Sequence, residues 1–228
     1  MNYNKREIFN MFKNTPLYKG MDFSEEENYK IFSALKNFEN DFFCSNGASK
    51  LVFIPKDTSK DFVIKIPYSG MYHTIFEDDG RIRESYCRYK KAGNKERPWD
   101  YCLTEVLRYK TAVSHGLGRC FARTEYFGAI NGYPIYIQEK CDVFRHTNNI
   151  SHTKKAHNTT LKASGELDFD GFIDIDWLTD FRLYYGSVML RRFTKFIINN
   201  GWEDDLRIDN IGYINNRPVL IDYSSFLD

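Results

Sequence analysis

The sequence lacks the long apolar runs that mark membrane-spanning segments. No apolar stretch approaches the ~18 residues that suggest a helix able to cross a bilayer. The N-terminal stretch MNYNKREIFNMFKN also has no apolar centre of the kind found in secretory signals. These absences predict a soluble, cytoplasmic protein without a membrane partner.

Paired cysteines are missing as well. The five cysteines are widely spaced and form no Cys-x-x-Cys pair, which argues against a zinc site or a disulfide framework. We expect them to be small apolar residues in a reducing compartment: Cys44, Cys87, Cys102, Cys120 and Cys141.

The chain has no basic excess. Its 32 Lys and Arg nearly balance its 31 Asp and Glu, for a net charge of +1. Surfaces dedicated to nucleic acid normally show such an excess, so we do not expect nucleic acid as a partner. With 228 residues, 42% hydrophobic and 28% charged, the chain can form one large domain or two lobes.

Local patterns predict three segments. Residues 1–40 are expected to form a helical extension, with Ser24 to Glu27 as a capping box. Residues 41–140 contain three consecutive strands between 41 and 67 and a helix from Tyr101 to His115 that ends at Gly116. A hairpin over 121–139, turning at Asn131-Gly132, completes a five-stranded antiparallel sheet with one helix. Residues 68–99 are expected to be irregular, with part of 83–90 helical.

The third segment, 141–228, is expected to be mainly helical. Its first part, about 141–176, is polar and is interpreted as a mobile surface insertion. The acidic run from Asp168 to Asp176 lacks the terminal Glu of an EF-hand loop, so we do not predict a calcium site. One long helix is predicted over 177–200, followed by a loop and a short hairpin that end at a second apolar run.

Taken in order, these segments resemble the protein-kinase-like superfamily. The glycine-rich motif G-x-G-x-x-G-x-V falls on SNGASKLV, residues 45–52, and retains Gly47 and Val52. The V-A-I-K strand falls on FVIK, which ends at Lys65, and the glutamate of the following helix is best matched by Glu105, with Glu84 as the alternative. The strand that enters the hinge matches Tyr136 to Glu139, with Gln138 as gatekeeper.

The C-terminal segment carries the remaining motifs. The catalytic loop D-L-K-x-x-N falls on DLRIDN, residues 205–210, and D-F-G falls on DYS, residues 222–224. The resemblance implies that Asp205 orients or deprotonates the acceptor hydroxyl, and that Arg207 neutralises charge on the transferring phosphoryl group. It also implies that Asn210 and Asp222 hold Mg²⁺ through hard oxygen ligands.

The resemblance predicts an α+β, bilobal protein-kinase-like fold that binds ATP and Mg²⁺. Lys65 is then a catalytic residue that holds the α- and β-phosphates and is oriented by Glu105. The residues expected to contact the nucleotide are Gly47, Ala48, Ser49, Val52, Val63, Lys65, Glu105, Gln138, Glu139 and Cys141.

Several positions depart from the family pattern. Glu203-Asp204 replaces the His-Arg that precedes the catalytic Asp, and only one glycine of the glycine-rich motif remains. The sequence ends at Asp228 without an activation segment or an A-P-E motif. We therefore expect a minimal, truncated kinase-like protein of the bacterial or phage type.

Three functions remain open at this stage. The first is phosphoryl transfer from ATP to a protein hydroxyl. The second is a pseudokinase that serves as a binding or inhibitory module. The third is transfer to a small molecule, with the insertion at about 141–176 as a substrate lid.

Overall fold

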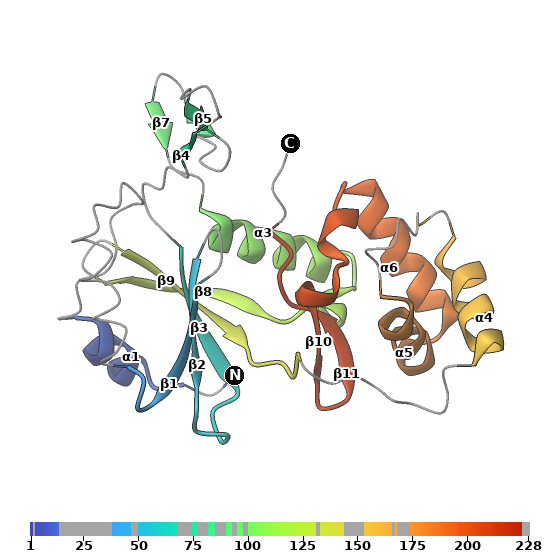
Figure 1. Ribbon diagram of the computed structural model, residues 1–228, viewed down its shortest axis with the longest axis horizontal. Coiled ribbons are helices and arrows are strands. Elements are labelled where there is room, and N and C mark those ends of the chain that lie inside the picture. The colour runs from blue at the N-terminus through green and yellow to red at the C-terminus, as the bar shows by residue number, and fades with distance from the viewer. Residues whose placement is uncertain are drawn as a thin grey trace. The chain divides into compact units, whose positions relative to one another are not determined.

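The computed structural model describes most of the chain, namely residues 1, 3–13, 38–46, 50–67, 74–76, 82–84, 90–92, 95–97, 100–130, 133–143, 153–165, 167 and 174–224. Within these residues the fold is α+β, as predicted (Figure 1). No helix of this described part is both long and apolar enough to cross a membrane.

The chain divides into two compact units. Unit 1 comprises Met1–Val106 and Thr124–Lys140, and unit 2 comprises Leu107–Arg123 and Cys141–Asp228. This division differs from the sequence-based one, because residues 107–123 belong to the second unit.

Unit 1 is built on a five-stranded antiparallel sheet, as the sequence predicted. The strand order is β1-β2-β3-β9-β8, and every neighbouring pair is antiparallel. The strands are β1 (Phe42–Asn46), β2 (Lys50–Pro55), β3 (Phe62–Pro67), β8 (Thr124–Ile130) and β9 (Tyr133–Glu139).

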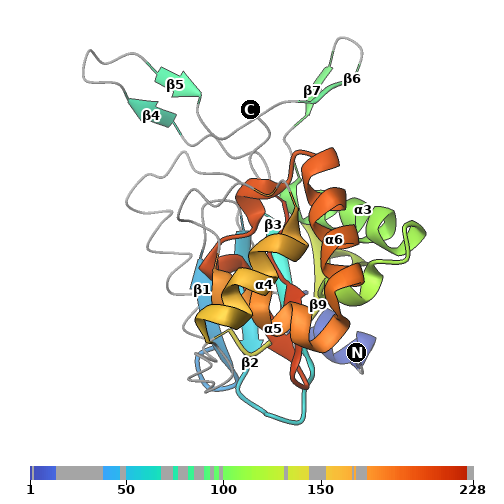
Figure 2. The same cartoon turned by 90° about the vertical axis from the view of Figure 1, so that its right-hand side faces the viewer.

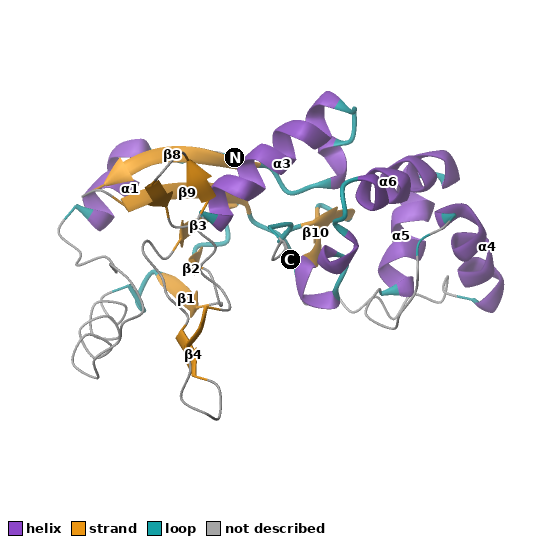
Figure 3. Cartoon of the chain, turned by 90° about the horizontal axis from the view of Figure 1, so that it is seen from above, coloured by secondary structure: helices purple, strands orange, loops and turns teal. Residues whose placement is uncertain are grey.

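One face of this sheet is apolar. Alternate side chains of β2 and β3, such as Leu51 and Ile64, belong to a buried cluster with Ile8 and Phe12 of helix α1 (Lys5–Phe12). Helix α1 therefore lies against this face (Figure 3). The predicted capping box at 24–27 lies outside the described residues.

The opposite face of the sheet carries polar side chains. Strand registers pair Val52 with Lys65, Lys65 with Tyr136, and Val63 with Gln138. Because side chains of a strand alternate between faces, these residues share one face, and so does Lys50, two positions before Val52.

Helix α3 (Tyr101–Ser114) begins in unit 1 and ends in unit 2. Its C-terminus is a Schellman motif, in which the Leu117 amide donates to the Ala112 carbonyl and the Gly116 amide to the Val113 carbonyl. Gly116 has a φ of +70°, which is costly for other residues. The predicted helix end at Gly116 is confirmed.

The described residues within 68–99 form two short antiparallel strand pairs. The strands are β4 (Thr74–Phe76), β5 (Ile82–Glu84), β6 (Lys90–Ala92) and β7 (Lys95–Arg97), paired β4 with β5 and β6 with β7. The prediction of a helix within 83–90 is therefore wrong for the described residues of that range, because Arg83, Glu84 and Lys90 lie in strands.

Unit 2 is mainly helical (Figure 2). Its helices α4, α5 and α6 contact one another pairwise, and α5 also contacts β11. Trp177, Phe181 and Phe193 are among the buried residues of its core. Its elements are α4 (Lys154–Ser164), α5 (Ile175–Tyr185), α6 (Ser187–Asn199), the 3₁₀ turns η1 (Gly118–Cys120), η2 (Glu203–Asp205) and η3 (Ile208–Asn210), and the hairpin β10 (Ile211–Ile214)/β11 (Arg217–Leu220).

Two predictions for unit 2 are wrong. The single helix over 177–200 is interrupted at Gly186, whose φ of +87° ends α5 before α6 begins. The polar insertion contains helix α4, in which Thr160 is fully buried and its hydroxyl lies 3.0 Å from that of Thr179. The polar composition of 141–165 gave no signal for this helix, because the hydroxyl contact between Thr160 and Thr179 forms part of its packed face.

Candidate functional site

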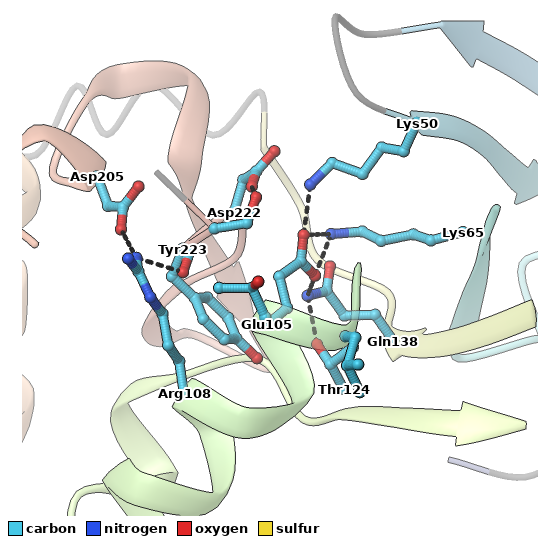
Figure 4. A network of polar contacts seen from close by, with 12 residues as sticks. Lys50, Lys65, Glu105, Arg108, Thr124, Gln138, Asp205, Asp222 and Tyr223 are labelled. Atoms are coloured by element: carbon cyan, nitrogen blue, oxygen red, sulfur yellow. Dashed lines mark hydrogen bonds and ion pairs between the residues drawn. The ribbon is translucent and has the colours of Figure 1, made fainter. Parts of the chain in front are cut away.

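The structure brings together Lys65 of β3 and Glu105 of α3 within unit 1 (Figure 4). Lys65 Nζ donates to Glu105 Oε2 at 2.8 Å and to Oε1 at 3.1 Å. The exposed fractions of these residues are 5% and 0%. Burying two charges carries a large desolvation cost, which only close contact and further hydrogen bonds offset. The pairing therefore constrains both side chains strongly.

A second lysine reaches the same carboxylate. Lys50, at the start of β2, donates from Nζ to Glu105 Oε1 and is 4% exposed. Sequence reasoning missed this residue. The available signal was its spacing, because Lys50 lies two positions before Val52, which pairs with Lys65 across the strands.

Gln138 and Thr124 complete the network. Gln138 Nε2 donates to Glu105 Oε2 at 3.2 Å and to Thr124 Oγ1 at 2.7 Å, and both residues are buried. The gatekeeper position predicted from the sequence thus carries an amide that binds Glu105 (Figure 4). Glu105 accepts hydrogen bonds from two ammonium groups and one amide.

Asp100 and Tyr136 position the start of α3. Tyr136 Oη donates to Asp100 Oδ2 at 2.5 Å, and the Leu103 amide donates to Asp100 Oδ1 at 2.9 Å. Burial raises the pKa of the Asp100 carboxyl above its ordinary value, and burial with the nearby Asp100 charge raises the pKa of Tyr136. These bonds tie the first turn of α3 to β9, so they set the position from which Glu105 projects.

The other residues predicted to contact the nucleotide are placed differently. Val63 is buried and Val52 is half-buried on the polar face of the sheet. Glu139 is half-buried at the end of β9, and Cys141 is half-buried in unit 2. Gly47, Ala48 and Ser49 lie outside the described residues.

In unit 2, Asp205 of η2 is bound to Arg108. Arg108 Nη1 donates to Asp205 Oδ2 at 2.6 Å and to the Tyr223 carbonyl at 2.8 Å. The guanidinium also lies over the Trp202 ring, 4.5 Å from its centroid. Arg108 and Asp205 are 5% and 2% exposed. Sequence reasoning assigned no role to Arg108, whose partners lie about a hundred residues further along the chain.

The residues predicted to bind metal lie on adjoining backbone segments of unit 2. Asn210 is buried in η3, and its carbonyl accepts a hydrogen bond from the Ile221 amide at 2.8 Å. This bond brings the segment that contains Asp222 alongside Asn210. The Asp222 side chain is half-buried and accepts from Ser224 Oγ at 3.0 Å.

The chemistry of these two side chains fits Mg²⁺, which binds few protein oxygens and retains water or phosphate ligands. The described part of the chain contains no group of three or more His, Cys, Asp or Glu arranged for a metal ion. Asn210 and Asp222 together supply one amide and one carboxylate, which is a smaller donor set than such a group.

Two further positions bear on the D-F-G and catalytic-loop assignments. Tyr223 is fully buried, and its hydroxyl donates to the Ala122 carbonyl at 2.6 Å. Arg207 is exposed, and its Nε lies 4.0 Å from Asp209 Oδ1. The first residue anchors the chain beside Asp222, whereas the second makes a surface contact.

No protein-family model matches this sequence, and comparison with curated proteins and with solved structures gives no match either.

Proposed function

We propose that this chain is a kinase-like phosphotransferase that moves the γ-phosphoryl group of ATP to a protein hydroxyl. The observation that carries the proposal is the buried Lys65–Glu105 pair, formed between a strand of a five-stranded antiparallel sheet and a helix. In the proposal, unit 1 is the N-terminal lobe of a bilobal protein-kinase-like fold and unit 2 is a reduced, helical lobe.

Lys65 is proposed to hold the α- and β-phosphates of ATP. A lysine ammonium binds phosphate well only if it is held in place, and Glu105 supplies that constraint through its two oxygens. Gln138 and Thr124 restrain the carboxylate in turn. The sheet and α3 thus present a preorganised cation.

Asp205 is proposed to orient the acceptor hydroxyl. Arg108 fixes Asp205 Oδ2, so the carboxylate has a defined orientation in unit 2. Asn210 and Asp222 are proposed to hold Mg²⁺, which supplies charge neutralisation at the phosphates when bound. Arg207 is exposed and is proposed to stabilise charge on the transferring group.

Transfer of label from [γ-³²P]ATP tests this proposal. The protein is incubated with ATP, Mg²⁺ and a cell lysate, and labelled proteins are separated by electrophoresis. We expect labelling that Asp205→Asn abolishes and that Asp204→Asn, an exposed acid in the same loop, leaves intact. Absence of labelled protein with the unmodified chain contradicts the proposal.

One observation favours the pseudokinase alternative. The Asp205 carboxylate is 2% exposed and bound to Arg108, an arrangement that also suits a carboxylate that stabilises a loop. A nucleotide-binding module of this kind would show a higher melting temperature with ATP and Mg²⁺ but no transfer to proteins. Transfer to hydroxyls of small molecules is separated from both by a panel of sugar and aminoglycoside acceptors.

A further inference from the structure

The polar face of the unit 1 sheet focuses positive charge on one carboxylate oxygen. Lys50 and Lys65 both donate to Glu105 Oε1, and Lys65 also donates to Oε2. All three residues are at most 5% exposed. Like charges that converge in a poorly solvated site repel each other strongly, and the Glu105 carboxylate offsets part of this repulsion by accepting from both ammonium groups.

The strand register explains how the two lysines meet. Lys50 and Val52 lie on one face of β2, and Val52 pairs with Lys65 of β3. The two lysines therefore lie on adjacent strands, displaced by two residues along the sheet. Figure 4 shows both ammonium groups pointing toward Glu105 from the same side.

Lys50 also occupies an unusual position in the motif. In the match of SNGASKLV to G-x-G-x-x-G-x-V, Lys50 stands where the third glycine is expected. A glycine there lets backbone amides approach phosphate, whereas a lysine offers a charged donor to the same group. With Lys50 at this position, a charged side chain therefore takes the place of backbone amides in recognising phosphate.

We propose that Lys50 and Lys65 form a two-lysine clamp for the phosphate chain of a nucleoside triphosphate. This inference rests on the proposed nucleotide-dependent function and adds Lys50 to its binding residues. Glu105 holds both ammonium groups in the absence of nucleotide, and the phosphate chain then takes contacts from both. Because the clamp recognises charge, affinity rises with the number of phosphates.

Calorimetric titration with a phosphate series tests the clamp. ATP, ADP, AMP and inorganic tripolyphosphate are titrated into the unmodified chain and into Lys50→Gln and Lys65→Gln. Glutamine keeps a donor for Glu105 but removes the charge. Lys60→Gln is the matched control, since Lys60 is a more exposed lysine of the same unit, paired with Glu7.

We expect each clamp variant to lose about tenfold or more in affinity for ATP and tripolyphosphate, the size of one lost charge-assisted hydrogen bond. The loss for AMP should be smaller, and the dependence of ATP affinity on salt should weaken. Lys60→Gln should bind all four ligands like the unmodified chain.

Four results would overturn the clamp. If Lys50→Gln binds ATP normally while Lys65→Gln does not, Lys65 acts alone and the proposed function stands. If Lys50→Gln loses affinity equally for ATP and AMP, its role is structural. If Lys50→Gln does not fold, the titrations of the unmodified chain test the clamp instead. Equal affinity of the unmodified chain for ATP, ADP and AMP would exclude charge-based recognition. If the unmodified chain binds no nucleotide, the clamp and the proposed function both fail.

Discussion

Glu105 in unit 1 and Asp205 in unit 2 are both buried carboxylates bound by basic side chains, yet they are neutralised in different ways. Glu105 is shared by two lysines and an amide. Asp205 is bound by one arginine, which divides its donors between the carboxylate and the Tyr223 carbonyl. In unit 1 two ammonium groups share one carboxylate, and in unit 2 a carboxylate and a backbone carbonyl share one guanidinium.

The difference teaches what each site can do. A carboxylate with two cations tolerates loss of one of them and can release an ammonium group to an anionic ligand. The Asp205 carboxylate accepts from a buried arginine that also donates to the Tyr223 carbonyl before Ser224 and packs on Trp202. In the proposed function, the unit 1 site exchanges partners with phosphate, whereas the contacts of Arg108 fix the orientation of Asp205 in unit 2.

The largest effect is expected from Glu105→Gln. It leaves two buried ammonium groups without their common carboxylate, and breaking a buried charge pair costs about 3–5 kcal/mol. Urea unfolding measures the loss in free energy of unfolding. Glu7→Gln, an exposed glutamate of unit 1 that pairs with Lys60, is the control and should change stability little. A loss for Glu105→Gln as small as that of the control would show that the network does not stabilise the unit.

Arg108→Met is expected to rank second, at about 3 kcal/mol, because Asp205 remains buried without its guanidinium. Adding Asp205→Asn to Arg108→Met should restore part of this loss, and the four proteins form a double-mutant cycle. Arg191→Met, an exposed arginine of α6, is the control. Additive effects of the two substitutions would contradict direct coupling between Arg108 and Asp205.

Lys65→Met should cost less than Arg108→Met, about 1–2 kcal/mol, because Lys50 still neutralises Glu105. The Lys50→Met/Lys65→Met double variant should lose more than the sum of the single variants, since Glu105 then lacks both ammonium groups. The stability of the double variant tests most directly whether Glu105 and Asp205 are neutralised in different ways. A single Lys65→Met loss equal to that of Arg108→Met would show that Lys50 gives no reserve.

The smallest effect is expected from Asp100→Asn, and it depends on pH. Burial raises the pKa of Asp100 above its unfolded value, so its stabilising contribution is fully present below the unfolded pKa and is lost as pH rises through the folded pKa. Asparagine does not titrate. The stability of Asp100→Asn relative to the unmodified chain should therefore increase as pH rises above about 4.

Urea unfolding between pH 3 and pH 7 checks this sign. Asp57→Asn provides a control of opposite direction, because hydrogen bonds from Ser59 lower the pKa of Asp57. The contribution of Asp57 is present above its unfolded pKa and is lost as pH falls through its folded pKa. A stability difference for Asp100→Asn that is constant across this range would contradict the raised pKa.

Local sequence signals predicted much of unit 1. Alternating apolar residues and the Asn131-Gly132 turn predicted the five strands, and Gly116 marked the end of α3. The same signals failed in unit 2, where α4 buries Thr160 instead of a fully apolar face. Gly186 lies within an otherwise continuous helical pattern, and only its left-handed backbone separates α5 from α6.

For the candidate sites, sequence by itself determined which residues are proposed to carry the chemistry: a lysine within an apolar strand, a glutamate on the next long helix, and the acids and amide of 205–222. It determined them because residue type and order persist in any conformation. The tertiary structure alone decided the partners. Strand register placed Lys50 beside Lys65, and folding within unit 2 placed Arg108 on Asp205. Such contacts join residues far apart in the chain, and their energies depend on burial, which no local pattern specifies.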